Sequence, residues 1–191
     1  MLISDYCQVY LKRLFEITQT IDLRQIENFF SICENARNNN NKIFFAGNGG
    51  SSATASHFAS DFLGANIKMK IKPPYQTISL TDNNSVITAL GNDNGFENIF
   101  IEQLKVLFEE GDILIAISAS GNSENLVNAC KWVKGKKGIS IGWLGFNGGK
   151  LNTICDNVIL INTPIGEYAP VEDMHLIINH ILVSWMHIKL S

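Results

Sequence analysis

Two side chains that can bind a metal or move a proton lie one helical turn apart in an apolar segment. In HFASDF, His57 and Asp61 are four residues apart, so they share one face of the helix predicted over residues 51–63. This spacing suits two ligands of one metal ion, or a base and its neighbour. It equally suits an ordinary pair of side chains on a protein surface. The spacing alone leaves both interpretations open.

A second group of such residues lies near the C-terminus, in VEDMHLIINHILVSW. Glu172 and His175 share one face of the helix predicted over residues 170–190, while Asp173 and His180 lie two turns apart and nearly in register. The rest of the segment is largely apolar, which predicts a buried helix, and buried acids and histidines need partners or a metal. Two acids with two histidines therefore indicate a polar site.

Two turns of small residues follow strand-like segments, GNGGSS at residues 47–52 and SASGNS at residues 118–123. Glycines let backbone amides approach a ligand, serines supply hydroxyl donors, and the helix predicted after each turn adds its positive N-terminal end. Neither turn matches GxxxxGK[ST] or GxGxxG, which argues against ATP and NAD. Helix capping alone would explain one such turn. Two of them favour a small phosphorylated ligand.

Alternating strands and helices must position these residues. Short apolar runs predict five strands, at residues 42–46, 76–80, 112–118, 138–144 and 157–161. Longer segments predict helices at residues 2–20, 23–36, 51–63, 85–90, 95–108, 123–134 and 170–190. The run GNDNG, residues 91–95, is predicted as a loop. Strands separated by helices predict a parallel sheet in an α/β domain, with a binding crevice at the carboxyl ends of the strands.

The composition excludes several classes of protein. A chain of 191 residues with 46% hydrophobic and 17% charged residues suits one globular domain. Acids outnumber bases, 18 to 15, so nucleic acid is not an expected partner. No signal peptide and no apolar run of about 20 residues is evident, which predicts a cytoplasmic protein without a membrane partner. The four cysteines form no CxxC pair and are expected to be reduced.

Four segments of the sequence together resemble the SIS (sugar isomerase) domain family: GNGGSSATASHFASDFLG, GNDNGFENIF, GDILIAISASGNSENLV and HLIINHI. The similarity covers nearly the whole chain. It implies a single SIS domain over residues 1–191, a central five-stranded parallel sheet flanked by helices, and an N-terminal helical pair over residues 1–40 that mainly makes oligomer contacts. It also implies a homotetramer.

The activity that the resemblance implies is that of an aldose-ketose isomerase with one zinc ion per subunit. The reaction would convert sedoheptulose 7-phosphate to D-glycero-D-manno-heptose 7-phosphate, for the heptose of lipopolysaccharide or capsule. Carried over by position, the implied contacts to the sugar phosphate are Asn48, Gly49, Gly50, Asn92, Asp93, Ser118, Ala119, Ser120 and Ser123. The hydroxyl of Ser51, in the first turn of small residues, is predicted to bind the phosphate as well.

The implied metal ligands are His57, Asp61, Glu172 and His180, and the last three are also the implied catalytic residues. The chain departs from the family twice. Asp61 stands where the family has a glutamate that acts as ligand and base, and Glu172 stands where it has a glutamine. The aspartate is one methylene shorter, which matters because proton transfer needs hydrogen-bond reach. His180 is the expected opposing acid.

These two departures leave alternatives open. Either Asp61 or Glu172 is the base, or the substrate is a different sugar phosphate. A further alternative is a SIS protein without catalytic activity that regulates or binds other proteins. Because an interaction module has no need to bury the polar groups at His57 and His180, the sequence favours an enzyme.

Overall fold

The computed structural model describes residues 1–189 and contains one parallel sheet. Its strands are β1 (Lys42–Gly47), β2 (Gln76–Ser79), β3 (Ile113–Ser118), β4 (Ile139–Gly145) and β5 (Asn157–Ile161). The strand order is β2-β1-β3-β4-β5, and each neighbouring pair is parallel. The predicted single α/β domain with a five-stranded parallel sheet is confirmed.

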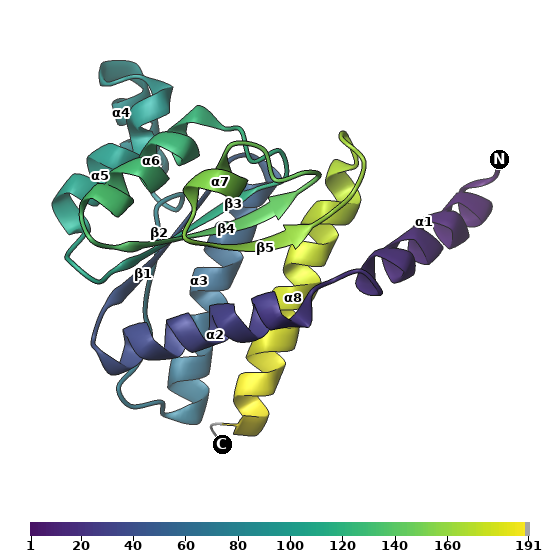
Figure 1. Cartoon of the computed structure of the whole chain (residues 1–191), viewed down its shortest axis with the longest axis horizontal. Helices are drawn as coiled ribbons and strands as arrows, with labels where there is room; N and C mark the ends of the chain where they lie inside the picture. The colour runs from purple at the N-terminus through teal and green to yellow at the C-terminus, as the bar shows by residue number, and fades with distance from the viewer. Residues whose placement is uncertain (190–191) are drawn as a thin grey trace.

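Helices cover both faces of the sheet (Figure 1). They are α1 (Ile3–Thr18), α2 (Leu23–Asn38), α3 (Gly50–Met69), α4 (Asn84–Asp93), α5 (Ile99–Leu107), α6 (Glu124–Gly135), α7 (Leu151–Ile154) and α8 (Tyr168–Lys189), with a 3-10 turn at Phe96–Asn98. None of the described helices is long and apolar enough to cross a membrane. The predicted end of the last helix, at residue 190, lies outside the described residues.

Alternate residues of the central strands enter two separate cores. Phe45 of β1 packs with α2, α3 and α8 on one face, whereas Phe44 packs with α5 and α6 on the other. Both side chains are fully buried. A strand that is buried on both faces needs a continuous apolar run, which explains why these strands were recognisable from hydrophobicity alone.

The main differences from the predicted helices are the ends of α3 and α4 and the presence of α7. α3 continues past Gly64 to Met69, because Phe62 and Ala65 on either side of this glycine are buried against the core. Such packing outweighs the cost of about 1 kcal/mol for a glycine inside a helix. α4 extends to Asp93, so the predicted loop at residues 91–95 is wrong over its first three residues. The short helix α7 was not predicted.

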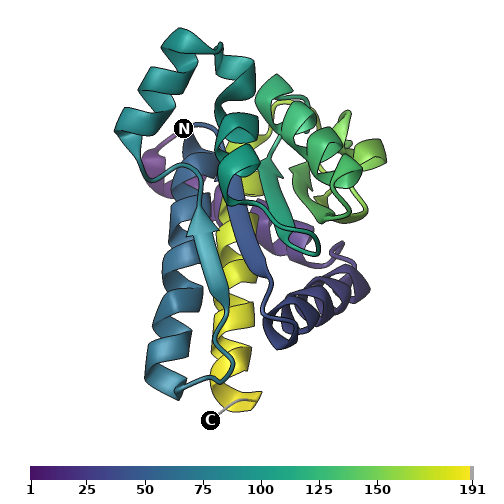
Figure 2. The ribbon, with the colours of Figure 1, turned by 90° about the vertical axis from the view of Figure 1, so that its left-hand side faces the viewer.

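The long helices α3 and α8 lie side by side on one face of the sheet (Figure 2). Both begin near the carboxyl ends of the strands, and both carry the predicted acids and histidines. The N-terminal helix α1 instead projects from the body (Figure 1). It is attached by Tyr10, whose hydroxyl donates to Asp173 Oδ2 at 2.5 Å, and by Arg13, which makes two hydrogen bonds to Glu167.

His175 is expected to make the folded protein sensitive to acid. The ring is fully buried beside Trp143, with centroids 5.9 Å apart, and burial lowers its pKa from 6.5 to about 4. The ring is therefore neutral when folded but gains a proton below about pH 6.5 when unfolded. Its contribution to stability is complete above that pH and declines as the pH falls toward 4, by about 2 kcal/mol between pH 7 and pH 5.

Urea unfolding at these two pH values measures the effect. The variant His175→Leu lacks the titrating ring and is expected to lose about 2 kcal/mol less than the wild type over this interval. Equal pH dependence of the two proteins would contradict this account.

Candidate active site

The two turns of small residues meet where the order of the sheet reverses. From β1 the chain crosses outward to β2, then returns past β1 to β3, so the turns after β1 and β3 flank the switch point. Ligands bind at such points in open parallel sheets. The turns enclose a pocket of about 310 Å³. Its lining comprises Asn48, Gly49, Gly50, Ser51, Ile117, Ser118, Ala119, Ser120, Ser123, Tyr168 and Glu172.

The turn after β3 can present hydroxyl protons to an anion. The Oγ of Ser118 accepts the Gly121 amide at 3.0 Å, and the Oγ of Ser120 accepts the Asn122 amide at 3.3 Å. Because both oxygens accept from the backbone, their own protons remain available to donate. The N-terminus of α6 follows at Glu124 and adds its positive dipole.

Gly121 allows this turn to form, and replacing it should disrupt the pocket. Its φ is +63°, and an added Cβ would lie 1.9 Å from the Gly148 carbonyl oxygen. Gly121→Ala is therefore expected to destabilise the fold by about 1–3 kcal/mol from the backbone conformation alone. It should also raise KM for the predicted phosphorylated ligand, because the Gly148 loop or the turn must move. Urea unfolding and steady-state kinetics measure the two effects.

Gly135→Ala is the matched control for this prediction. An added Cβ there meets nothing within 4 Å, and Gly135 is the last residue of α6. This variant is expected to keep KM and to match or exceed wild-type stability. Similar behaviour of the two variants would contradict the role assigned to Gly121.

A reciprocal pair of amides holds the two turns together. Asn48 in the first turn and Asn125 at the start of α6 each donate to the other at 2.9 Å. Asn125 is only 2% exposed, and its Oδ1 also accepts the Leu126 amide. Asn125 is not among the residues predicted from the sequence to form the site. An asparagine in the first turn of a helix is common, so the only available signal was its place just after the serine turn.

Glu172 extends from α8 into the same pocket. A Cβ added to Gly50 would lie 2.5 Å from Glu172 Oε2, so the carboxylate lies directly against the N-terminus of α3. This end of the helix dipole stabilises an anion. Glu172 thus lies with the predicted phosphate-binding residues rather than with the histidines.

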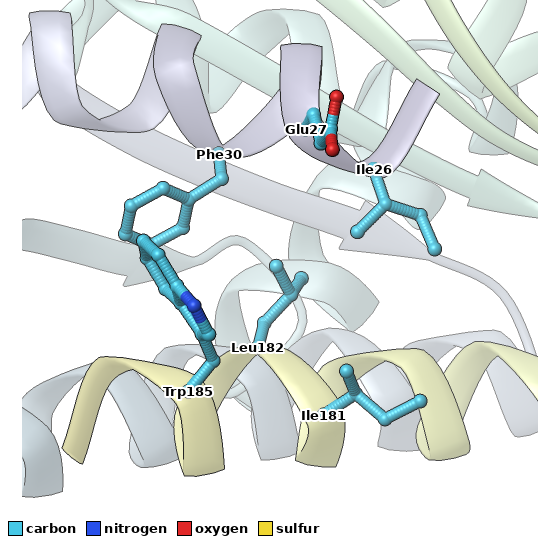
Figure 3. Close-up of a pocket in the computed structure, with 6 residues that line it drawn as sticks. All are labelled: Ile26, Glu27, Phe30, Ile181, Leu182 and Trp185. Carbon is cyan, nitrogen blue, oxygen red and sulfur yellow. The ribbon is translucent and has the colours of Figure 1, made fainter. Parts of the chain in front are cut away.

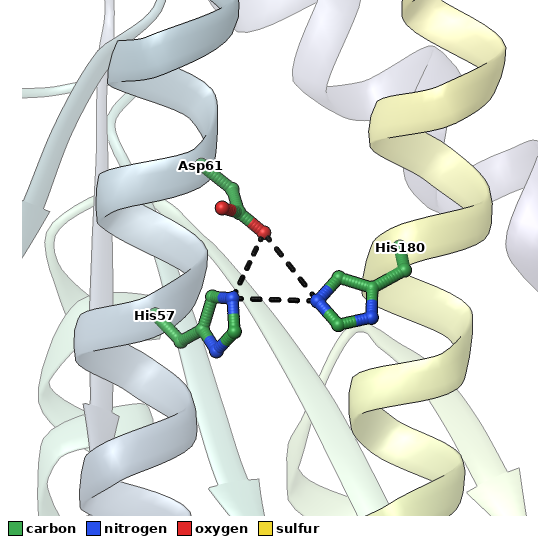
Figure 4. Close-up of side chains that lie close together, drawn as sticks. All are labelled: His57, Asp61 and His180. Carbon is green, nitrogen blue, oxygen red and sulfur yellow. Dashed lines mark hydrogen bonds and ion pairs between the residues drawn. The ribbon is translucent and has the colours of Figure 1, made fainter.

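A separate polar group lies further along the same two helices (Figure 4). His57 Nε2 is 3.3 Å from His180 Nε2, and Asp61 Oδ2 is 3.4 Å from the first nitrogen and 4.0 Å from the second. Both imidazoles are partly open to solvent, at 43% and 57% exposure of their side chains. The structure thereby brings together three of the four predicted metal ligands.

The geometry of this group fits a zinc ion. Ligand atoms of all three residues lie within 4.8 Å of one another, and two imidazoles with one carboxylate are donors that zinc prefers. Two ligands at 2.0–2.1 Å from a tetrahedral ion lie about 3.4 Å apart, close to the 3.3 Å between the histidine nitrogens. Glu172 is not part of the group found among residues 1–189, and its expected role as a ligand stays a prediction.

Asn92 and Asp93 lie in the last turn of α4 and are exposed. Their side chains hydrogen bond to each other at 2.7 Å, and neither lines the pocket between the two turns. The structure therefore does not bring these two side chains into this pocket, and their contact with substrate stays a prediction.

The fold and these two groups of residues define a class of protein. A family model described as the SIS domain matches residues 5–142, and the chain belongs to this family. A phosphoheptose isomerase from a Nitratiruptor species is 40% identical over 153 residues, which cover 80% of each chain. One from Aneurinibacillus thermoaerophilus is 35% identical over 95% of this chain and 92% of its own.

A solved structure is similar as well. The phosphoheptose isomerase of Neisseria gonorrhoeae has a TM-score of 0.86 and 28% identity, covering 97% of this chain and 99% of its own. Within the SIS domain family, the chain is a member of the phosphoheptose isomerases.

Proposed function

We propose that the protein is an aldose-ketose isomerase that converts sedoheptulose 7-phosphate to D-glycero-D-manno-heptose 7-phosphate, for lipopolysaccharide or capsule heptose. The membership of the phosphoheptose isomerases supports this reaction. The observation that carries it in the structure is the spacing of the two groups of polar residues along one pair of helices.

This spacing suits a long sugar phosphate. His57 lies seven residues after Gly50 on α3, about 10 Å along the helix axis. An extended chain advances about 1.25 Å per single bond, so the phosphorus of a 2-ketoheptose 7-phosphate lies about 9 Å from C2. The same distance in a triose phosphate is about 4 Å. A seven-carbon substrate therefore spans from the serine turns to the histidines, and a triose does not.

The two turns bind the phosphate in this proposal. Hydroxyls of Ser51, Ser118, Ser120 and Ser123 donate to its oxygens, together with backbone amides of Gly49 and Gly50. The helix dipoles of α3 and α6 favour the bound anion. With its phosphate held at this end, the sugar extends toward Asp61 and its carbonyl is oriented for proton transfer.

Asp61 acts as the base. Its Oδ2 faces the histidines, while its Oδ1 has no hydrogen bond to any residue in the described part of the chain. Oδ1 takes a proton from C1, which is alpha to the ketone at C2. The electron pair of the broken C–H bond forms the C1=C2 double bond. The carbonyl oxygen at C2 gains a proton, and the product is an enediol. Return of a proton to C2, with loss of the O1 proton, yields the aldose.

Zinc held by His57, Asp61 and His180 would polarise the oxygens of the substrate when bound. From the sequence, His180 is expected to be the acid that donates a proton opposite the base. Its Nε2 cannot ligate a metal and donate a proton at the same time, so the two roles exclude each other at that atom.

Apolar surfaces on the helices support a homotetramer, in which α1 and α2 mainly make contacts between subunits. α1 and the residue before it expose large apolar side chains: Leu2, Ile3, Tyr6, Val9, Leu11 and Phe15. An apolar groove between α2 and α8 offers a complementary surface (Figure 3). It is lined by Ile26, Glu27, Phe30, Ile181, Leu182 and Trp185. We place the assembly in the cytoplasm, where sugar phosphates are metabolised.

Incubation of the purified protein with sedoheptulose 7-phosphate, with and without zinc, tests the proposal. Formation of the aldose that increases with zinc is the expected result. Ketose phosphates of three, five and six carbons serve as controls and should turn over more slowly. Turnover of one of these without turnover of the heptulose would overturn the assignment of substrate.

A further inference from the structure

Asn179 contacts the carboxylate of Asp61 from the interior of the protein. Its Nδ2 lies 2.6 Å from Asp61 Oδ2, and the residue is fully buried in α8, directly before His180. An ionised carboxylate only accepts hydrogen bonds, so the amide must present its NH2 group to Asp61. A hydrogen bond to a charged group is among the stronger ones in proteins.

The other half of this amide, Oδ1, has no hydrogen-bond partner in the part of the chain that the structure describes. Asn179 Oδ1 is buried and makes no hydrogen bond within residues 1–189. A buried acceptor without a partner opposes folding. Its neighbours on α8, Ile178 and Leu182, belong to the apolar core, where a leucine at position 179 would avoid this cost. Within residues 1–189, the hydrogen bond to Asp61 is the contact that accounts for a polar side chain at this buried position.

The contact selects which oxygen of Asp61 faces the histidines. The oxygen that accepts from Asn179 is the one that lies 3.4 Å from His57 Nε2 and 4.0 Å from His180 Nε2. Without this donor the carboxylate is free to rotate about its last torsion, which is broad and roughly two-fold. Rotation would exchange the two oxygens between the histidines and the substrate side.

We propose that Asn179 is a positioning residue that holds Oδ2 of Asp61 toward the histidine pair and leaves Oδ1 free for the substrate. This inference rests on the proposed function, in which Asp61 is both ligand and base. Partners behind a metal ligand orient it, and their loss typically lowers metal affinity or activity 10- to 100-fold.

The variant Asn179→Leu in the full-length protein tests the inference. Its Kd for zinc, measured by competition with a chelating dye, is expected to rise about 10- to 100-fold, and kcat at saturating zinc to fall by a similar factor. KM should stay within about twofold, because the phosphate-binding turns lie about 10 Å away. Ile178→Ala, at the buried neighbour, is the control; it should lower the urea midpoint and leave Kd and kcat unchanged.

A double-mutant cycle with Asp61→Ala separates positioning from packing. If Asn179 acts through Asp61, Asn179→Leu should not weaken zinc binding further once the carboxylate is absent. A lower urea midpoint with wild-type Kd and kcat in Asn179→Leu would overturn the inference and leave the proposed function intact.

Absence of both zinc binding and turnover in the wild type would instead overturn the proposed function. In that case the same double-mutant cycle is measured by urea unfolding. A coupling of about tenfold in the folding equilibrium constant between positions 61 and 179 supports the contact between Asn179 and Asp61. Additive effects of the two substitutions refute it.

Discussion

Asp61→Asn is expected to lower kcat for sedoheptulose 7-phosphate by a factor of about 10² to 10⁴, which is the usual contribution of a general base. The amide has the shape of the carboxylate but cannot accept the proton from C1. KM should change little, because Asp61 lies eleven residues after Gly50, about 16 Å along α3 from the phosphate-binding turns. Steady-state kinetics at saturating zinc give both constants, and the Kd for zinc of the same variant shows how far lost metal binding contributes.

Glu172→Gln is the matched comparison, because it makes the same change from acid to amide at the other predicted base. Glu172 lies against Gly50 at the phosphate end of the pocket, and eight residues separate it from His180 on α8, about 12 Å along the helix. Loss of a carboxylate beside the phosphate is expected to lower KM and to leave kcat within about tenfold. A large loss of kcat in this variant with none in Asp61→Asn would assign the base to Glu172.

His180→Ala is expected to raise the Kd for zinc by about 100- to 1,000-fold. This factor follows from dividing the total binding free energy of a four-ligand zinc site, about 10–16 kcal/mol, among its ligands. His57→Ala should have an effect of the same order, because its Nε2 faces the same point from α3. Competition with a chelating dye measures both constants.

Ile181→Ala provides the control for zinc binding. This residue follows His180 on α8 but belongs to the apolar groove between α2 and α8 rather than to the metal-ligating group. Wild-type affinity is expected. If His57→Ala and His180→Ala also bind zinc as the wild type does, the ion is held elsewhere and the assignment of these ligands is wrong.

What could be predicted from the sequence depends on how far apart in the chain the interacting residues lie. Strand β1 was predictable because its buried residues are consecutive in the sequence, and the His57 and Asp61 pair because helical spacing alone brings their side chains together. The end of α3 was not predictable, since Gly64 signals a stop that packing of Phe62 and Ala65 overrides. Local propensity is weaker than burial of a helix face.

The amide residues show the same limit within the candidate site. Asn125 and Asn179 carry no spacing pattern and lie in segments dominated by other signals. Their partners are 77 and 118 residues away in the chain. Only a folded chain shows that one amide joins the two turns and that the other lies behind Asp61.

The sequence by itself determined the alternation of strands and helices, the two turns of small residues and the pairing of His57 with Asp61, because each depends on neighbours within a few residues. Tertiary structure alone decided that Glu172 lies with the phosphate-binding turns while His180 lies with His57. The physical reason is the rigidity of α8. Eight residues of helix hold these two side chains about 12 Å apart, so packing of α8 against α3 assigns each to a different end of the site.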